Sequence, residues 1–129
     1  MARTYARRAF PFIAALFSAC VVIQVFLAGL GVFDDARSFL THRDFGYTFG
    51  WLTLLMLVAA ILGQMGRRFV GLSGLLLVLF ALQSVFVALR ADMPQVAALH
   101  PVIGFAIMLV ALVATWTSWP RRPEVSANA

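Results

Sequence analysis

The chain contains two histidines, and each is followed four residues later by a glycine. His42 precedes Gly46, and His100 precedes Gly104, so the pattern His-x-x-x-Gly occurs twice. An imidazole can ligate a metal or carry a proton at physiological pH. Residues four apart lie on the same face of a helix. If both patterns are helical, each glycine leaves space one turn from its imidazole, where a flat ligand between two helices would need room.

A glutamine precedes each histidine at nearly the same distance. Gln24 lies 18 residues before His42, and Gln83 lies 17 residues before His100. The segment Gln24-Val-Phe-Leu-Ala also resembles Gln83-Ser-Val-Phe-Val-Ala. Self-similarity at a regular spacing indicates an internal repeat. We therefore interpret the chain as two halves, each with a glutamine-bearing helix, a loop and a helix that opens with His-x-x-x-Gly.

The composition indicates that these elements lie in a membrane. Of the 129 residues, 63% are hydrophobic and 12% are charged, whereas about 25% of a typical soluble domain is charged. The mean hydropathy is +0.95. These values exclude a soluble globular domain, and the length suits a single domain. The net charge of +5 comes from ten arginines in short clusters between apolar runs, a pattern that argues against nucleic-acid binding.

Four charge-free stretches separate the arginine clusters. They cover residues 9–33, 45–66, 69–89 and 93–120. Each is long enough to cross a hydrocarbon core as a helix of about 20 residues. Because the bilayer core has no water to satisfy backbone groups, these stretches must be helical. The first is longer than the roughly 7–15 apolar residues of a cleaved signal peptide, which favours a retained span.

The predicted fold is an all-α integral membrane protein, an up-down-up-down four-helix bundle. Short links between the stretches make neighbouring helices antiparallel. The two hairpins enter the membrane from the same side and therefore form parallel repeats. We expect spans at about 9–33, 42–66, 69–89 and 94–119, a basic segment at 1–8 and a disordered tail at 120–129.

The arginines are unequally divided between the two ends of this predicted bundle. Seven fall at one end: Arg3, Arg7, Arg8, Arg67, Arg68, Arg121 and Arg122. The other end has three arginines and four of the five acidic residues. The positive-inside rule then predicts that both termini of this multi-pass protein are cytoplasmic.

In such a bundle the second and fourth helices lie diagonally across the core, which places His42 and His100 opposite each other near the outer side. Ionisable residues inside a membrane are costly and are candidates for function. The alternative is that each histidine bonds lipid headgroups or loop carbonyls. A zinc or copper site needs more than two imidazoles, and Cys20 is expected to lie too deep to join them. A haem needs only two axial ligands, because the porphyrin supplies the other four.

Other polar residues near the outer side fit such a site. Arg37, Arg43 and Arg90 are expected at its wet edge, where they would pair with propionates. Gln24 and Gln83 either bond between helices or bond the edge of a quinone or haem.

The start of the fourth helix determines the depth of the second histidine. Asp92 is a suitable cap, and Pro94 suits the first turn. His100 is then about 9 Å below the helix start at 1.5 Å per residue. Pro101 lies inside this predicted helix and is expected to kink it.

These residues resemble one half of haem A synthase, a family built from two four-helix haem-binding repeats. The likeness covers roughly residues 20–118 and rests on Gln24, His42-Arg43, Gln83 and Leu99-His100. It implies that His42 and His100 are the axial ligands of one haem. More loosely, the chain is similar to an uncharacterised bacterial family of small four-span proteins with an Ala-Gly-Leu-Gly segment after Gln24.

The chain also departs from the synthase pattern. The catalytic half of haem A synthase has an acidic residue one turn before the first histidine, where this chain has Phe39, and many members have a cysteine pair in an outer loop. The resemblance therefore implies a shared cofactor-binding scaffold, without the oxidation chemistry. Whether the chain is an enzyme stays open.

We therefore expect a b-type haem-binding protein that transfers electrons or holds haem. The haem b would be bound non-covalently, because the chain has no Cys-x-x-Cys-His motif. Two histidine ligands favour electron transfer over oxygen activation. The expected partners are a quinol within the membrane or an extracytoplasmic redox protein. The alternative is a cofactor-free scaffold or accessory subunit of a homo- or hetero-oligomeric complex.

Overall fold

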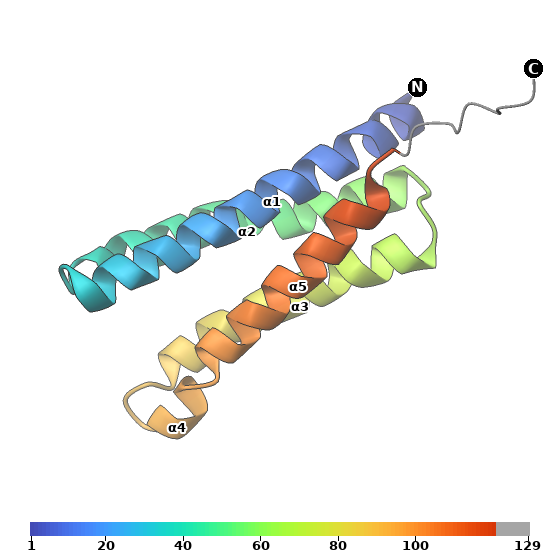
Figure 1. The fold of residues 1–129 in the computed structure, drawn as a ribbon. Helices are drawn as coiled ribbons and strands as arrows, with labels where there is room; N and C mark the ends of the chain where they lie inside the picture. The colour runs from blue at the N-terminus through green and yellow to red at the C-terminus, as the bar shows by residue number, and fades with distance from the viewer. Residues whose placement is uncertain (121–129) are drawn as a thin grey trace, which may run out of the picture.

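The computed structural model describes residues 1–120, and this part of the chain folds into helices without strands (Figure 1). The helices are α1 (Ala2–Phe33), α2 (Ser38–Leu62), α3 (Arg67–Ala88), α4 (Pro94–Ala97) and α5 (His100–Ser118). Four segments are long and apolar enough to cross a membrane, the fourth being Pro94–Ser118. The predicted all-α class with four spans is confirmed.

The helix ends differ from the predicted spans. α1 begins at Ala2, so the basic segment 1–8 is part of the helix rather than a separate segment before it. α2 covers Ser38–Leu62, so the predicted span from residue 42 starts one turn inside this helix, and a short connection leads on to α3. Gly66 in this connection has a φ of 89°, a backbone conformation that glycine adopts without steric cost. The disordered tail was predicted at 120–129, and positions 121–129 lie outside the described residues.

The fourth span is broken near its start, contrary to the prediction of one continuous helix. α4 covers only Pro94–Ala97, and α5 begins at His100 after a two-residue turn. The N-cap of α4 is Met93 rather than Asp92, and it has no side-chain cap hydrogen bond. Pro101 lacks a backbone N–H and therefore suits a first turn better than a helix interior. His100 is consequently the first residue of α5, not a residue deep inside a longer helix.

The helices form two hairpins, α1 with α2 and α3 with α5. α1 contacts α2 and α5, and α3 also contacts α2 and α5. The second and fourth spans therefore occupy diagonal corners, in agreement with the sequence prediction. Figure 1 shows the hairpins diverging toward the end that holds the α1–α2 turn and α4.

The packed core lies toward the other end, where the N-terminus is. On α1 it consists of Phe10, Ala14, Phe17 and Val21, whose spacing of four, three and four residues forms one helical stripe. The partners on the other helices include Phe49, Met56, Ala60, Leu76, Ile107, Ala111 and Ala114. The small alanines let the helix backbones approach closely.

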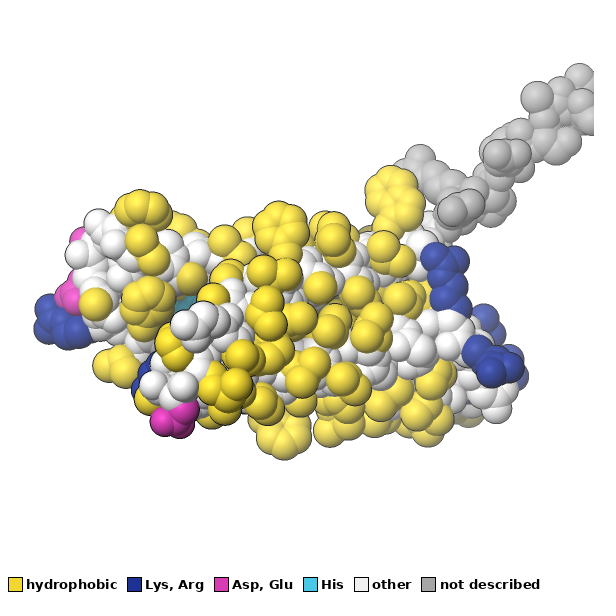
Figure 2. Space-filling view, turned by 90° about the horizontal axis from the view of Figure 1, so that it is seen from below, with side chains coloured by type: hydrophobic (Ala, Val, Ile, Leu, Met, Phe, Trp, Pro, Cys, Tyr) yellow, Lys and Arg dark blue, Asp and Glu magenta, His cyan; other side chains and the backbone are white. Residues whose placement is uncertain are grey.

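The outer surface has the pattern of a membrane protein. Large apolar side chains cover its middle, and Phe105 and Trp51 are 74% and 69% exposed. Figure 2 shows this apolar band in yellow, with the charged side chains gathered at the two ends. Because such a surface is stable in lipid and not in water, we describe the chain as a multi-pass membrane protein.

Candidate functional site

The structure brings His42 and His100 together across the diagonal of the bundle. His42 lies one turn into α2, and His100 starts α5. The centroids of the two rings are 6.1 Å apart, and the ring planes are inclined by 65°. Both residues are half-buried. Figure 2 shows imidazole surface recessed between the hairpins, near the end that carries the aspartates.

His42 is held by Gln24 of α1 through two reciprocal contacts. Nδ1 of His42 lies 3.0 Å from the backbone oxygen of Gln24. In return, Nε2 of Gln24 donates to the backbone oxygen of His42 at 2.7 Å. A carbonyl oxygen can only accept, so Nδ1 carries the proton and the lone pair of the neutral ring is on Nε2. The Gln24 backbone therefore selects the tautomer and orients the ring.

His100 has the equivalent partner on α3. Its Nδ1 lies 3.4 Å from the backbone oxygen of Gln83, a longer contact than that of His42. The same reasoning puts the lone pair of His100 on Nε2. Within residues 1–120 neither imidazole Nε2 forms a hydrogen bond. The repeat inferred from sequence thus has a structural basis: each glutamine supplies the backbone oxygen that faces a histidine.

The glycines make room for the glutamine amides. A Cβ placed on Gly46 would lie 2.9 Å from Nε2 of Gln24, and one on Gly104 would lie 3.2 Å from Nε2 of Gln83. The space that the sequence pattern predicted for a flat ligand is therefore occupied. Spacing along a helix identifies the face on which a glycine lies, but not which neighbouring side chain fills the vacated space.

Each glutamine also leaves a buried oxygen without a partner. Oε1 of Gln24 and Oε1 of Gln83 are buried and accept no hydrogen bond from the described residues. An unpaired buried acceptor costs about 1–3 kcal/mol and commonly marks the place of a water or ligand. Both oxygens belong to residues that contact the histidines.

The three arginines predicted to lie at the outer edge of the site all have local partners. Arg37 pairs with Asp35 at 2.7 Å, and Arg43 pairs with Asp44 at 2.8 Å. Arg90 donates to a backbone oxygen near the end of α3 at 3.2 Å. These local partners are reached with little loss of side-chain entropy, because each lies within three residues of its arginine. Hydrogen bonds from the Arg37 side chain and backbone also lower the pKa of Asp35.

Aromatic rings fill the core beside the histidine pair, on the side toward the N-terminus. The Phe49 ring centroid lies 5.2 Å from that of Phe45, 5.3 Å from that of Phe80 and 5.4 Å from that of Phe17. Phe45 is three residues after His42 on α2, so the cluster begins within one turn of the imidazole. These rings close the core on that side.

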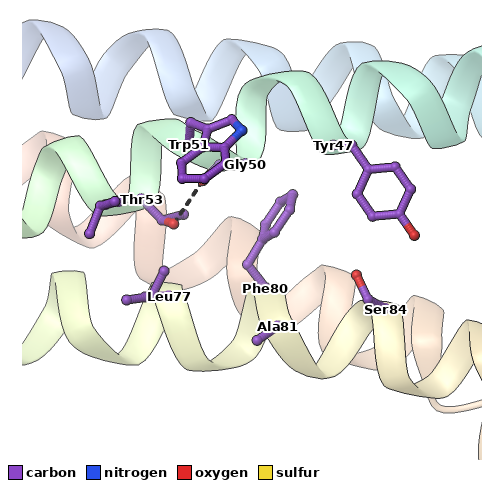
Figure 3. Close-up of a pocket in the computed structure, with 9 residues that line it drawn as sticks. Tyr47, Gly50, Trp51, Thr53, Leu77, Phe80, Ala81 and Ser84 are labelled. Carbon is purple, nitrogen blue, oxygen red and sulfur yellow. Dashed lines mark hydrogen bonds between the residues drawn. The ribbon is translucent and has the colours of Figure 1, made fainter.

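A shallow groove of about 400 Å³ lies between α2 and α3 (Figure 3). Its lining residues include Tyr47, Gly50 and Trp51 on α2 and Phe80 and Ser84 on α3. The absent side chain of Gly50 admits the Phe80 ring, which would come within 2.5 Å of a Cβ. The sequence did not predict this groove, because the pattern does not show which faces of α2 and α3 meet.

The described residues offer no metal site made by protein side chains alone. Within residues 1–120, no three or more His, Cys, Asp or Glu side chains are grouped closely enough to hold a metal ion. Cys20 is a free thiol on α1. A metal held by His42 and His100 would therefore need its remaining ligands from a prosthetic group.

Fold and site together define a four-span membrane bundle with a repeated glutamine–histidine–glycine arrangement. Residues 24–90 match the model of DUF6220, a family of unknown function, and the chain belongs to that family. The matched segment includes His42 and Gln83 and ends before His100. No curated protein and no solved structure matches the chain. The family match agrees with the looser resemblance to an uncharacterised family, whereas the likeness to haem A synthase rests only on the residues quoted for it.

Proposed function

We propose that this protein binds one haem b non-covalently between His42 and His100. The observation that carries the proposal is the contact of each imidazole Nδ1 with a backbone oxygen. Histidines that ligate metals commonly donate their other ring N–H to a carbonyl or carboxylate, which fixes the tautomer and the ring orientation. Both imidazoles are thereby prepared to ligate through Nε2.

The separation of the rings also supports the proposal. Because a metal–imidazole bond is about 2 Å long, both rings could reach one metal held between them. The observed separation of His42 and His100 is 6.1 Å. The porphyrin would supply the four ligands that the described protein residues do not offer. The Gln24 and Gln83 side chains would have to leave the space beside Gly46 and Gly104 to admit it.

A haem held by both histidines would supply one-electron transfer rather than oxygen activation. The chain's own residues would hold and orient the ligands: Gln24 positions His42, and Gln83 positions His100. Electron transfer and haem storage both follow from this arrangement. Arg37, Arg43 and Arg90 would pair with propionates only by leaving their present partners.

A quinol within the membrane or an extracytoplasmic redox protein is the proposed partner. The groove between α2 and α3 has an apolar floor and carries the hydroxyls of Tyr47 and Ser84 at one end (Figure 3). It would therefore suit a quinol head group that arrives from the lipid. By the positive-inside rule, we also propose a bacterial inner-membrane location with the arginine-rich end in the cytoplasm.

The absorption spectrum of the purified protein tests the haem proposal. We expect a reduced-minus-oxidised spectrum with b-type bands, and we expect these bands to be absent in His42→Ala and in His100→Ala. Thr48→Val is the control, because the Thr48 hydroxyl bonds within its own helix on an exposed face, so this variant should keep the spectrum. A colourless, folded protein that takes up no added haem would overturn the proposal and favour a cofactor-free scaffold or accessory subunit.

A further inference from the structure

The arginine-rich end of the bundle has a groove of its own. It lies between the end of α2 and the start of α3 and encloses about 430 Å³. Its lining residues are Ala60, Ile61, Gln64, Gly66, Arg67, Val70 and Gly71. Ala60, Ile61 and Val70 give it an apolar wall, while Gln64 and Arg67 bring an amide and a guanidinium to its edge.

The charge at this end of the molecule is entirely positive among the described side chains. Five arginines lie there: Arg3, Arg7, Arg8, Arg67 and Arg68. The four aspartates in residues 1–120 lie at the opposite end, and Figure 2 shows the two groups apart. None of the five arginines forms a salt bridge within residues 1–120. Among the side chains of residues 1–120, the groove therefore lies in a region of positive charge without nearby acidic partners.

A second arginine approaches the same connection between α2 and α3. The stem of Arg7 packs on Gly63, where a Cβ would lie 3.0 Å from Arg7 Cγ. Such stems cover apolar surface while the charged group reaches the polar boundary of the membrane. The guanidinium groups of Arg7 and Arg67 thus belong to one end of the bundle, at the level where an apolar span gives way to water.

From this charge and shape we propose that the groove binds one anionic phospholipid. The Arg67 guanidinium would pair with the phosphate, and an acyl chain would lie along the accessible side chains of Ile61 and Val70. Phosphate accepts hydrogen bonds from the fixed fork of a guanidinium, and basic pockets between membrane helices bind anionic head groups. Net positive charge favours an anionic lipid over a zwitterionic one.

Two glycines keep this groove open. A Cβ at Gly66 or at Gly71 would meet nothing within 4 Å, so no neighbouring side chain has filled the space. Gly74 is equally unobstructed, but it does not line the groove. Gly71 and Gly74 therefore form a matched pair for substitution.

Native mass spectrometry of the detergent-purified protein, titrated with phosphatidylglycerol or phosphatidylcholine, tests the proposal. We expect one retained phosphatidylglycerol and much weaker retention of phosphatidylcholine. Arg67→Gln should weaken phosphatidylglycerol binding by about fivefold to tenfold, since one arginine near anionic lipid contributes about 1 kcal/mol. Arg68→Gln removes the same charge from a residue outside the groove and should have a much smaller effect.

The glycine pair tests the shape of the site independently of charge. Gly71→Leu should displace the lipid, whereas Gly74→Leu should retain it, and circular dichroism should show that both variants keep the helical content. Equal losses of phosphatidylglycerol binding in Arg67→Gln and Arg68→Gln would show that the lipid is attracted by the overall positive charge and not by this groove, which would overturn the proposal. Equal binding of the two lipids, or unchanged binding in Gly71→Leu, would overturn it as well.

Discussion

The first hairpin, α1 with α2, and the second, α3 with α5, orient their histidines in the same way but not equally tightly. In the first, His42 Nδ1 lies 3.0 Å from the Gln24 backbone oxygen, and the Gln24 amide donates a bond of 2.7 Å in return. In the second, the corresponding distance from His100 to Gln83 is 3.4 Å. The Gln83 side chain makes no hydrogen bond to the other residues of the described chain.

The difference follows from how the two histidine helices begin. α2 starts at Ser38, so His42 already lies within a regular helical turn. α5 starts at His100 itself, after the short α4 and a turn. The first residue of a helix has fewer backbone hydrogen bonds to hold it. A sequence repeat therefore specifies the same partners in both halves without specifying the same rigidity.

The largest difference in stability between the hairpins is expected when Gly46 and Gly104 are each replaced by alanine. Gly46→Ala would put a Cβ 2.9 Å from an amide that is already hydrogen-bonded, so one of them must shift. Overpacking of this kind costs about 1–3 kcal/mol. Gly104→Ala meets the Gln83 amide at 3.2 Å, and this amide is free to move, so the loss should be smaller. Unfolding in detergent measures both, and an equal loss would contradict the proposed asymmetry.

Replacing each glutamine with methionine should give a smaller difference in stability between the two hairpins. Gln24→Met and Gln83→Met both remove a buried oxygen without a partner, but only Gln24→Met also removes a side-chain hydrogen bond. Interhelical hydrogen bonds in membranes contribute about 0.6 kcal/mol on average. We expect Gln24→Met to be less stable than Gln83→Met by about this amount in the same unfolding assay. The reverse order would show that the Gln24 bond does not stabilise the first hairpin.

The smallest effect is expected in the turn of the first hairpin. Arg37→Gln removes the hydrogen bonds of the Arg37 side chain to Asp35, so the pKa of Asp35 should rise toward its ordinary value. Because folding lowers this pKa, the Asp35 contribution to stability is present above the ordinary pKa of aspartate and is lost as the pH falls through the folded-state pKa. The pair is exposed, so overall stability should hardly change.

An NMR titration of the Asp35 carboxyl, in the parent protein and in Arg37→Gln, measures that shift directly. Arg43→Gln is the control, since Arg43 pairs with Asp44 and not with Asp35. An Asp35 pKa that is the same in the parent and in Arg37→Gln would show that the ion pair does not form in solution.

Charge-free stretches predicted the number and order of the spans, because charged side chains are excluded from hydrocarbon. This exclusion holds whether the helix ends at the membrane boundary or continues beyond it. For the same reason they did not predict the helix ends. α1 begins at Ala2 and includes Arg3, Arg7 and Arg8, since a helix can continue beyond the hydrocarbon into water. The break before His100 was also missed, although Pro101 was recognised as a helix-distorting residue.

At the candidate site, spacing identified which residues meet but not which atoms they use. The repeat placed His42 opposite His100, as the structure has them. It left open whether Gln24 and Gln83 bond between helices or to the edge of a cofactor, and their contacts with the histidines were not predicted. The backbone oxygens that face the imidazoles could not be predicted, since every residue has one. The pairing of Arg37 with Asp35 could have been predicted from their closeness in sequence, whereas the sequence prediction assigned Arg37 to a haem propionate.

The separation of charge along the bundle gives the molecule a permanent direction. Five arginines of the described chain stand at one end, and its four aspartates stand at the other. Turning the molecule over in a bilayer would carry every guanidinium group of that end through hydrocarbon, at a cost of about 2.5–3.5 kcal/mol for each. The orientation adopted during insertion is therefore kept for the lifetime of the molecule, and a population inserted with both orientations would not equilibrate.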